Sequence, residues 1–253
     1  MKYSWVFDFD GTLSDLTDQR KDAVLNTLCK KMLKRLAETE NQIVAIISSR
    51  TIDDLIHRVR IKGIVLAGGS GMEILLPNGQ RLAPNEKTRQ KVSAARARIL
   101  PVLQTEFGQI PGVDIEDKRW SIAVHFRHTS APLKRYVGQV LPALTKRCHL
   151  QYFHGPEAFE IPLFHGHSKV RGLRNLIRLY PGEITPNRLT IAGDDQNDLE
   201  AMNWIKARDG NCLIVGGAIK LRGARRVSSP DALAREVLAR LQRMREIKGA
   251  ILQ

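Results

Sequence analysis

Few cysteines and no long apolar runs occur in this sequence of 253 residues, and both absences exclude classes of protein. The three cysteines, Cys29, Cys148 and Cys212, are far apart and odd in number, which argues against a disulfide framework and against a zinc knuckle. No apolar run approaches the roughly 18 residues that span a bilayer. The first residues also lack the long apolar stretch of a signal peptide. We therefore expect a protein of the reducing cytoplasm that does not associate with membranes.

Acidic residues are scarce relative to basic ones: 40 Lys and Arg stand against 26 Asp and Glu, a formal net charge of +14. Such an excess can indicate a nucleic-acid partner, an anionic membrane surface, an anionic substrate or only a basic solvated face. Because no nucleic-acid motif or aromatic stacking platform accompanies the charge, nucleic-acid binding stays a remote alternative. A last helix is predicted to begin at Ser229-Pro230, and we interpret it as a packed helix with a solvated basic face.

Strand and helix patterns alternate in the first and last thirds of the chain, which predicts a parallel sheet covered by helices. The predicted strands here are Tyr3–Phe7, Ile43–Ile47, Gly63–Ala67, Arg188–Ala192 and Asn211–Val215. The predicted helices are Arg20–Glu38, Asp53–Val59, Lys169–Leu179 and Asp198–Asn203.

The pattern changes in the middle of the chain. A long basic helix over about Asn85–Glu106 precedes strand pairs joined by short turns, which is typical of an antiparallel sheet with helices on one side. The predicted elements are strands Val113–Asp117, Ser121–Phe126, Gln151–His154 and Phe159–Pro162, with a helix near Pro132–Thr145. The predicted fold class is therefore α/β: a Rossmann-like parallel-sheet core with helices on both faces, over 1–81 and 164–253, plus an inserted α+β domain over 82–163.

Two carboxylates, Asp8 and Asp10, directly follow the first predicted strand, in the sequence DFDGTL. Unpaired acids beside a buried strand end are costly, so a cation is expected near them. One carboxylate can attack phosphorus while the other handles the proton of the leaving group. The alternative is a turn with merely exposed acids, but Gly11 and Thr12 at fixed offsets favour a functional motif.

A second acidic group, Asp194, Asp195 and Asp198, follows the predicted strand Arg188–Ala192. Carboxylate oxygens at this density suit Mg²⁺ rather than zinc. The alternative is an acidic N-cap cluster on the next helix. Because ligands bind at the carboxyl ends of parallel strands, we expect this group to converge with Asp8.

Two further candidates could hold a phosphate. Ser48 follows the strand Ile43–Ile47 and is followed by Ser49 and Arg50, so its hydroxyl and the free N–H groups of a helix start could bind a phosphate oxygen. Lys169 stands at a predicted helix start, where a lysine is unfavourable unless an anion is present. The alternatives are a helix-capping serine and a solvated surface lysine.

In this order, the DFDGTL motif, the strand-end serine, the lysine and GDDQND resemble the haloacid dehalogenase-like phosphatase superfamily. The resemblance implies Asp8 as nucleophile and Asp10 as general acid/base. It implies that Ser48 and Lys169 hold the phosphoryl group and adds Arg50 as a substrate-binding candidate. The ligands that it implies for Mg²⁺ are Asp8, Asp194 and the backbone carbonyl of Asp10, supported by Asp195 or Asp198.

Further segments are similar to the trehalose-6-phosphate phosphatases, in which a type-2 cap is inserted between the second and third motifs. The segment 65–74 (VLAGGSGMEI) looks like their Ala-Gly-x-x-Gly-x-Glu stretch, and 113–127 looks like their cap strands. The resemblance implies that Glu116, Lys118 and Arg127 bind sugar hydroxyls, and Glu160, just before the third motif, is a further candidate. The alternative for these charges is a cross-strand salt bridge on a solvated sheet face.

The resemblance implies hydrolysis of a sugar phosphate, with trehalose 6-phosphate as the first candidate. Ser49, Ser70 and the fourth motif depart from the trehalose phosphatase pattern, so glucosylglycerol phosphate and mannosyl-phosphoglycerate are alternative substrates. A phosphomutase would share the same nucleophile and metal. A nucleic-acid or partner-binding module is the remote alternative, and the synthase that makes the substrate is a possible partner.

Overall fold

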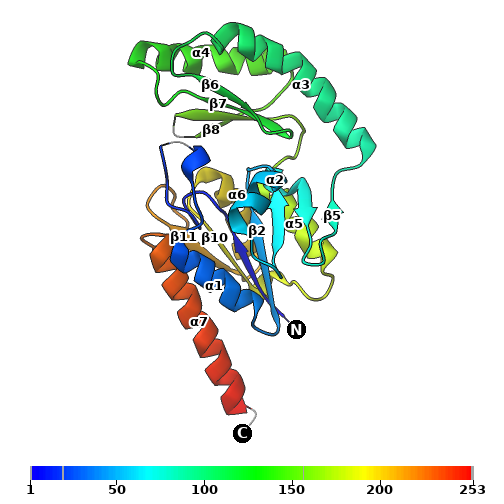
Figure 1. The fold of residues 1–253 in the computed structure, drawn as a ribbon, viewed down its shortest axis with the longest axis vertical. Coiled ribbons are helices and arrows are strands. Elements are labelled where there is room, and N and C mark those ends of the chain that lie inside the picture. Colours follow the sequence, from blue (N-terminus) through cyan, green and yellow to red (C-terminus); the bar gives the residue numbers. More distant parts are fainter. Residues whose placement is uncertain (1, 19, 156, 252–253) are drawn as a thin grey trace. The chain divides into compact units, whose positions relative to one another are not determined.

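The computed structural model describes residues 2–18, 20–155 and 157–251, and the chain divides into two compact units (Figure 1). Unit 1 comprises Met1–Leu82 and Ser168–Gln253, and unit 2 comprises Ala83–His167. Within the described ranges, no helix is both long enough and apolar enough to cross a membrane.

Unit 1 contains an eight-stranded sheet with the order β12-β11-β10-β1-β2-β3-β4-β5. Its strands are Tyr3–Phe7 (β1), Gln42–Ile47 (β2), Val65–Gly68 (β3), Glu73–Leu75 (β4), Arg81–Leu82 (β5), Leu189–Gly193 (β10), Asn211–Val215 (β11) and Arg225–Val227 (β12). From β12 to β3 the neighbouring strands run parallel, as predicted. At the other edge the short strands β4 and β5, which the sequence pattern did not predict, are antiparallel. The 3₁₀ turn Gly69–Gly71 (η2) between β3 and β4 is too short for a parallel crossover.

Helices cover both faces of this sheet, as predicted, because successive strand residues point to opposite sides. Trp5 and Phe7 belong to one apolar cluster, and Val6 between them belongs to the other. The first cluster includes residues of α1 (Thr27–Ala37), α2 (Ile52–Val59) and α7 (Pro230–Ile251). The second includes residues of α5 (Lys169–Leu179) and α6 (Gln196–Lys206).

The helix predicted over Arg20–Glu38 begins only at Thr27, which corrects the sequence-based expectation. The side chain of Asn26 accepts hydrogen bonds from the N–H groups of Leu28 and Cys29 and so caps the helix at this point. Upstream, Arg20–Asp22 (η1) forms a separate 3₁₀ turn. Val24, which lies inside the predicted range but before the observed helix, is 72% exposed.

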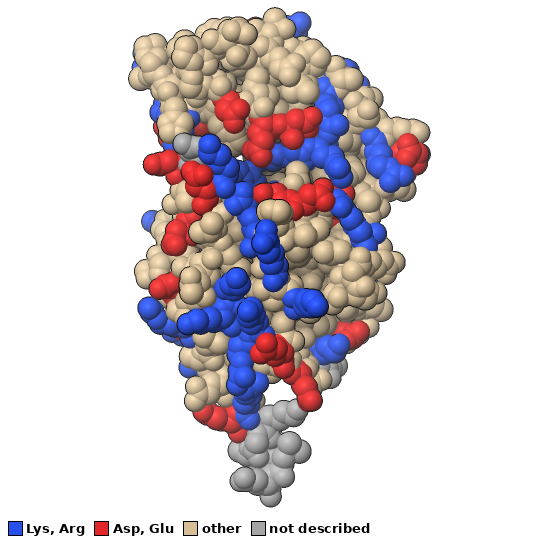
Figure 2. All heavy atoms as spheres, in the orientation of Figure 1, with Lys and Arg blue, Asp and Glu red and all other residues tan. Residues whose placement is uncertain are grey.

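One group of basic residues of unit 1 lies over the helices α1 and α7. Figure 2 shows Lys and Arg side chains clustered over the region in which α1 and α7 lie in Figure 1. The buried stripe of α7 includes Leu233, Val237 and Leu241, whereas Arg235 and Arg243 are exposed. This arrangement confirms the predicted packed helix with a basic outer face.

Unit 2 is an α+β unit with an antiparallel sheet of order β6-β7-β9-β8, as the middle of the sequence predicted. Its elements are α3 (Glu86–Phe107), β6 (Asp114–Asp117), β7 (Ser121–His125), α4 (Ala131–Arg147), β8 (Phe153–Gly155) and β9 (Ala158–Pro162). Both helices lie on one side of the sheet (Figure 1). Ile122 and Val124 are fully buried, while the alternate positions carry the polar face described below.

Candidate active site

Three predicted site residues follow the last residues of three neighbouring parallel strands. Asp8 follows β1, Ser48 follows β2 and Asp194 follows β10. The strand ends are level, because Phe7 of β1 pairs both with β2 and with β10, and the N–H of Asp8 donates to the carbonyl oxygen of Ala192 at 2.9 Å. The structure therefore brings these residues to one edge of the sheet, where open parallel sheets bind their ligands.

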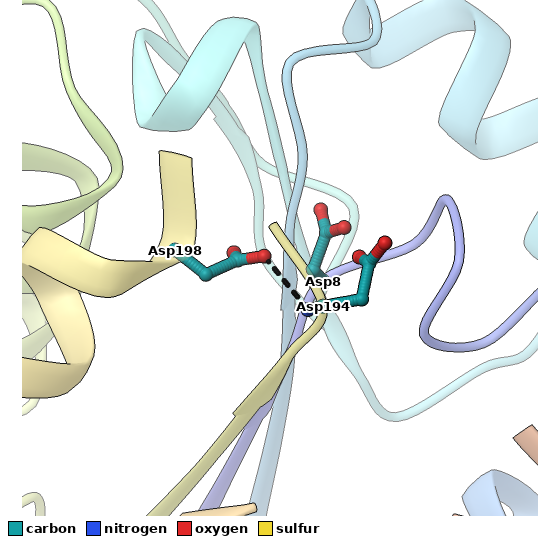
Figure 3. Close-up of side chains that lie close together, drawn as sticks. All are labelled: Asp8, Asp194 and Asp198. Atoms are coloured by element: carbon teal, nitrogen blue, oxygen red, sulfur yellow. Dashed lines mark hydrogen bonds between the residues drawn. The ribbon is translucent and has the colours of Figure 1, made fainter. Parts of the chain in front are cut away.

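A cluster of three carboxylates occupies this edge. Oxygens of Asp8, Asp194 and Asp198 lie within 4.8 Å of one another, and none of the three residues is more than 9% exposed. Figure 3 shows the carboxylates of Asp8 and Asp194 pointing the same way, while Asp198 reaches in from the start of α6. Buried carboxylates at such distances repel one another, and a bound cation or bound protons would offset this repulsion.

Asp198 has a role different from the other two carboxylates, because both of its oxygens are already hydrogen-bonded. Its Oδ2 accepts the backbone N–H groups of Asp194 at 3.1 Å and Asp195 at 3.3 Å, and its Oδ1 accepts a bond from Lys169. Asp195 caps α6 through Asn197 and is not part of the three-carboxylate cluster. The carboxylates best placed to ligate a cation are thus Asp8 and Asp194.

Lys169 links Asp8, the candidate nucleophile, to Asp198. Its Nζ lies 2.6 Å from a carboxylate oxygen of Asp8 and 2.6 Å from one of Asp198. The lysine is the first residue of α5, and α5 approaches η2 so closely that a Cβ on Gly71 would lie 2.2 Å from the Cα of Gly172. Glycine at both positions allows the approach that sets the start of α5.

Burial dominates the electrostatics of the cluster. It raises the pKa of Asp8 well above the usual range, and Asp198 and Asp194 raise it further against the opposing effect of Lys169. Burial, helped by neighbouring acids, raises the pKa of Asp194 to about 7 and that of Asp198 to about 6. Burial opposes the charge on Lys169, but Asp198 and Asp8 still raise its pKa well above the usual value. A bound divalent cation would replace the protons that these carboxylates otherwise retain.

The loop after β1 contacts Asp194 directly. Gly11 has a φ of +72°, and a Cβ at this position would lie 2.1 Å from Oδ2 of Asp194. The hydroxyl of Thr12 donates to Oδ1 of the same carboxylate at 3.2 Å. The glycine and threonine of the first motif therefore position the Asp194 carboxylate of the fourth motif, a predicted metal ligand.

Ser48 lies where the second motif predicts it, fully enclosed at the end of β2. Its Oγ accepts the backbone N–H of Arg50 at 3.2 Å, and its carbonyl accepts the N–H of Ser70 at 2.7 Å. Because the Oγ is the acceptor in this bond, the O–H of Ser48 remains able to donate to a phosphate oxygen.

The side chain of Arg50 is paired with two carboxylates. Its side chain is only 3% exposed, and its Nη2 lies 2.6 Å from a carboxylate oxygen of Asp10. Its Nη1 lies 2.6 Å from Asp54, a residue that the sequence reading did not select. The structure thus places Arg50 against the predicted general acid/base, and its substrate-binding role stays a prediction. Asp54 was missed because an acid in the first turn of a helix is already explained by the helix dipole.

Three of the four predicted sugar-binding residues come together on the polar face of unit 2. The Nζ of Lys118 lies 2.6 Å from Glu160 and 3.9 Å from Glu116. Arg127 follows β7 and instead pairs with Glu157 at 3.4 Å.

Sequence reading missed two polar side chains on the same face of unit 2. The hydroxyl of Ser121 donates to Glu160, and the Nε2 of His125 lies 3.1 Å from Glu116. Both alternate along β7 with buried apolar residues, so the period-2 pattern could have placed them on the polar face.

Comparison with known sequences supports one family. The sequence profile of a family described as trehalose-phosphatase matches residues 6–234. The trehalose-phosphate phosphatase of Mycobacterium marinum is 32% identical over 207 residues, which cover 79% of this chain and 50% of that protein. The Mycobacterium avium protein of the same name is 33% identical over 211 residues, with 79% and 50% covered. The chain thus spans about half the length of the curated relatives that it matches.

Solved structures agree on the fold. A trehalose-6-phosphate phosphatase related protein superposes with a TM-score of 0.75 at 17% identity, covering 99% of this chain and 100% of that one. The C-terminal domain of the Candida albicans trehalose-6-phosphate phosphatase gives 0.77 at 16% identity, covering 93% and 90%. At these identities the likeness concerns the fold alone. The profile match over most of the chain and the curated relatives together establish that the chain belongs to the trehalose-phosphatase family.

Proposed function

We propose that this chain is a Mg²⁺-dependent phosphatase that converts trehalose 6-phosphate and water to trehalose and phosphate. The observation that carries the proposal is the Lys169 ammonium, 2.6 Å from both Asp8 and Asp198, in a chain of the trehalose-phosphatase family. Family membership implies a small-molecule sugar phosphate as substrate and a divalent cation as cofactor. The curated relatives are trehalose-phosphate phosphatases, which supports trehalose 6-phosphate among the sugar phosphates.

The residues of the cluster fit Mg²⁺, because the buried donors are hard carboxylate oxygens. Asp8, Asp194 and the backbone carbonyl of Asp10 would hold the ion. Asp198 would support this site indirectly, through its hydrogen bonds with Lys169 and with the backbone N–H groups of Asp194 and Asp195. When bound, Mg²⁺ would offset the repulsion between the phosphate dianion and the carboxylate nucleophile and polarise the phosphoryl group.

In the first half-reaction, an oxygen of Asp8 attacks phosphorus and forms an aspartyl-phosphate while the bond to the sugar oxygen breaks. Asp10 donates a proton to that departing oxygen. Lys169 and the hydroxyl of Ser48 stabilise the charge of the transferring group. In the second half-reaction, Asp10 takes a proton from the attacking water, the bond between phosphorus and Asp8 breaks, and phosphate leaves.

Unit 2 corresponds in this proposal to the cap domain predicted over 82–163, which selects the sugar. Glu116, Lys118 and Glu160 offer both acceptors and donors on one sheet face. Each sugar hydroxyl both donates and accepts, so a mixed set of this kind suits a polyhydroxylated substrate. Association with the synthase that makes the substrate stays a prediction from the sequence.

The experiment is phosphate release with Mg²⁺ across a panel of sugar phosphates led by trehalose 6-phosphate, with Asp8→Asn as control. The expected result is turnover of trehalose 6-phosphate that EDTA abolishes and that the variant lacks. Preference for glucosylglycerol phosphate or mannosyl-phosphoglycerate would change the substrate but keep the reaction. A requirement for a bisphosphate activator, with phosphate returned to the sugar, would instead identify a phosphomutase.

A further inference from the structure

We propose that Asp54 is a positioning residue for Asp10, acting through the guanidinium of Arg50. The three side chains form a continuous set of hydrogen bonds, which we call the Asp54–Arg50–Asp10 network. This inference rests on the proposed function, in which Asp10 is the general acid/base.

The guanidinium of Arg50 holds the Asp10 carboxylate at both of its oxygens. Its Nε donates to Oδ2 at 2.8 Å, and its Nη2 donates to Oδ1 at 2.6 Å. Two parallel bonds between planar groups fix orientation as well as distance. The ring of Phe9, with its centroid 5.4 Å from the central carbon of Arg50, borders the guanidinium. Asp10 itself is 31% exposed, and these two bonds are much shorter than its 3.9 Å ion pair with Arg20.

Arg50 is in turn held at its opposite end. Its Nη1 donates to Oδ2 of Asp54 at 2.6 Å, and its Nη2 also donates to the carbonyl oxygen of Arg20 at 2.7 Å. A guanidinium has five N–H donors and, when buried, needs a partner for each. Removal of the Asp54 charge would leave Nη1 poorly paired and allow the buried group to turn away from Asp10.

Asp54 is itself anchored from two directions. It lies in the first turn of α2, where its N–H donates to the N-cap oxygen of Thr51 at 3.2 Å. The Nε of Arg58 contacts both of its carboxylate oxygens at 2.9 Å. Burial alone would raise the pKa of Asp54, but hydrogen bonds from Arg58 and Arg50 lower it. The carboxylate therefore stays ionised at neutral pH and gives Arg50 a fixed partner.

The consequence for catalysis concerns proton delivery to the leaving oxygen. A sugar alkoxide is a poor leaving group and needs a well-placed acid, whereas p-nitrophenolate leaves without one. Because kcat/KM reports the steps up to release of the leaving group, a misplaced Asp10 lowers it for the sugar phosphate and spares it for p-nitrophenyl phosphate. A merely structural defect lowers both alike.

The test compares Asp54→Asn with Asp53→Asn, a matched control that removes the neighbouring charge from the same helix turn. For Asp54→Asn we expect kcat/KM to fall about tenfold or more on trehalose 6-phosphate and less than about twofold on p-nitrophenyl phosphate. Asp53→Asn should change neither. Arg50→Lys keeps the positive charge but loses the paired hydrogen bonds to Asp10. It should therefore lower kcat/KM selectively on trehalose 6-phosphate even if Asp54→Asn folds poorly.

A double-mutant cycle gives an independent readout. If Asp54 acts through Asp10, the Asp54→Asn effect on the sugar phosphate should disappear in the D10N background. Equal losses on both substrates, the same loss in both backgrounds, or identical behaviour of the two helix variants would each overturn the positioning role. Absence of any turnover by the wild-type protein would instead refute the proposed function, on which the role depends.

Discussion

The ammonium nitrogen of Lys169 lies 2.6 Å from a carboxylate oxygen of Asp8, and both side chains are buried. We expect Lys169→Met to lower kcat/KM for trehalose 6-phosphate by about 100-fold or more, because a preorganised positive charge next to the transferring group is lost. Phosphate release at saturating Mg²⁺ measures the effect.

Lys31→Met is the matched control for this variant, since Lys31 lies exposed on α1. It should retain wild-type kcat/KM. Should Lys169→Met keep kcat/KM within about threefold of wild type, the stabilising role of this lysine would be rejected.

Gly11 is expected to be required for metal binding and not only for the turn. Gly11→Ala would put a Cβ 2.1 Å from Oδ2 of Asp194. Gly79→Ala is the matched control, because Gly79 also has a positive φ, +86°, but no atom lies within 4 Å of an added Cβ. Both substitutions carry the backbone cost of a positive φ, about 1–2 kcal/mol. Only Gly11→Ala should also raise the Mg²⁺ concentration for half-maximal activity, by about tenfold or more.

Activity titrated with Mg²⁺ in both alanine variants measures this difference, and thermal unfolding controls for the shared backbone cost. An equal Mg²⁺ requirement in the two proteins would mean that the Asp194 carboxylate moves aside without consequence.

Much of the fold was readable because buried strands and helices repeat simple patterns. Apart from Ser4 and Gln42, β1 and β2 consist of apolar and aromatic residues, which is typical of central parallel strands. By contrast β4, β5 and β12 have only two or three residues each, too few for a period to show. The start of α1 was misplaced because apolar spacing continued upstream to Val24, although the N-cap preference of Asn26 marked the true boundary.

The candidate site also contains residues whose positions were predictable and pairings that were not. Strand topology alone predicts that Asp8, Ser48 and Asp194 converge, because residues after parallel strands share one sheet edge. The partner of Arg50 could not be predicted, since it depends on where a long side chain lies among several acids. The pairing of Arg127 with Glu157 was hidden for the same reason.

Lys118 is expected to contribute to sugar binding more than Arg127 does. Its Nζ lies 2.6 Å from Glu160, whereas Arg127 pairs with Glu157 at 3.4 Å. Hydrogen bonds to charged groups contribute about 1.5–3 kcal/mol, so Lys118→Met should raise KM for trehalose 6-phosphate by about tenfold or more. Arg127→Gln should change it by less than about threefold.

Steady-state kinetics on trehalose 6-phosphate and p-nitrophenyl phosphate separate this effect from misfolding, because only the sugar substrate should respond. An equal rise in KM in the two variants would mean that Arg127 contributes to sugar binding as much as Lys118 does.

The stability of the metal-free protein should fall as pH rises, which is opposite to the behaviour of a paired aspartate. The folded pKa values of Asp194, about 7, and Asp198, about 6, exceed the usual value of 3.8. Between pH 3.8 and about 7, the folded state therefore binds more protons than the unfolded state. The free energy of unfolding decreases as pH rises through this range and is lowest above it. Mg²⁺ replaces the protons, and the stabilisation that it gives should therefore grow with pH across the same window. Urea unfolding with EDTA and with Mg²⁺, at several pH values, measures both trends. Asp194→Asn should reduce the pH dependence of the metal-free stability and weaken the stabilisation by Mg²⁺. If Mg²⁺ instead stabilises the protein equally at every pH, the cation binds elsewhere.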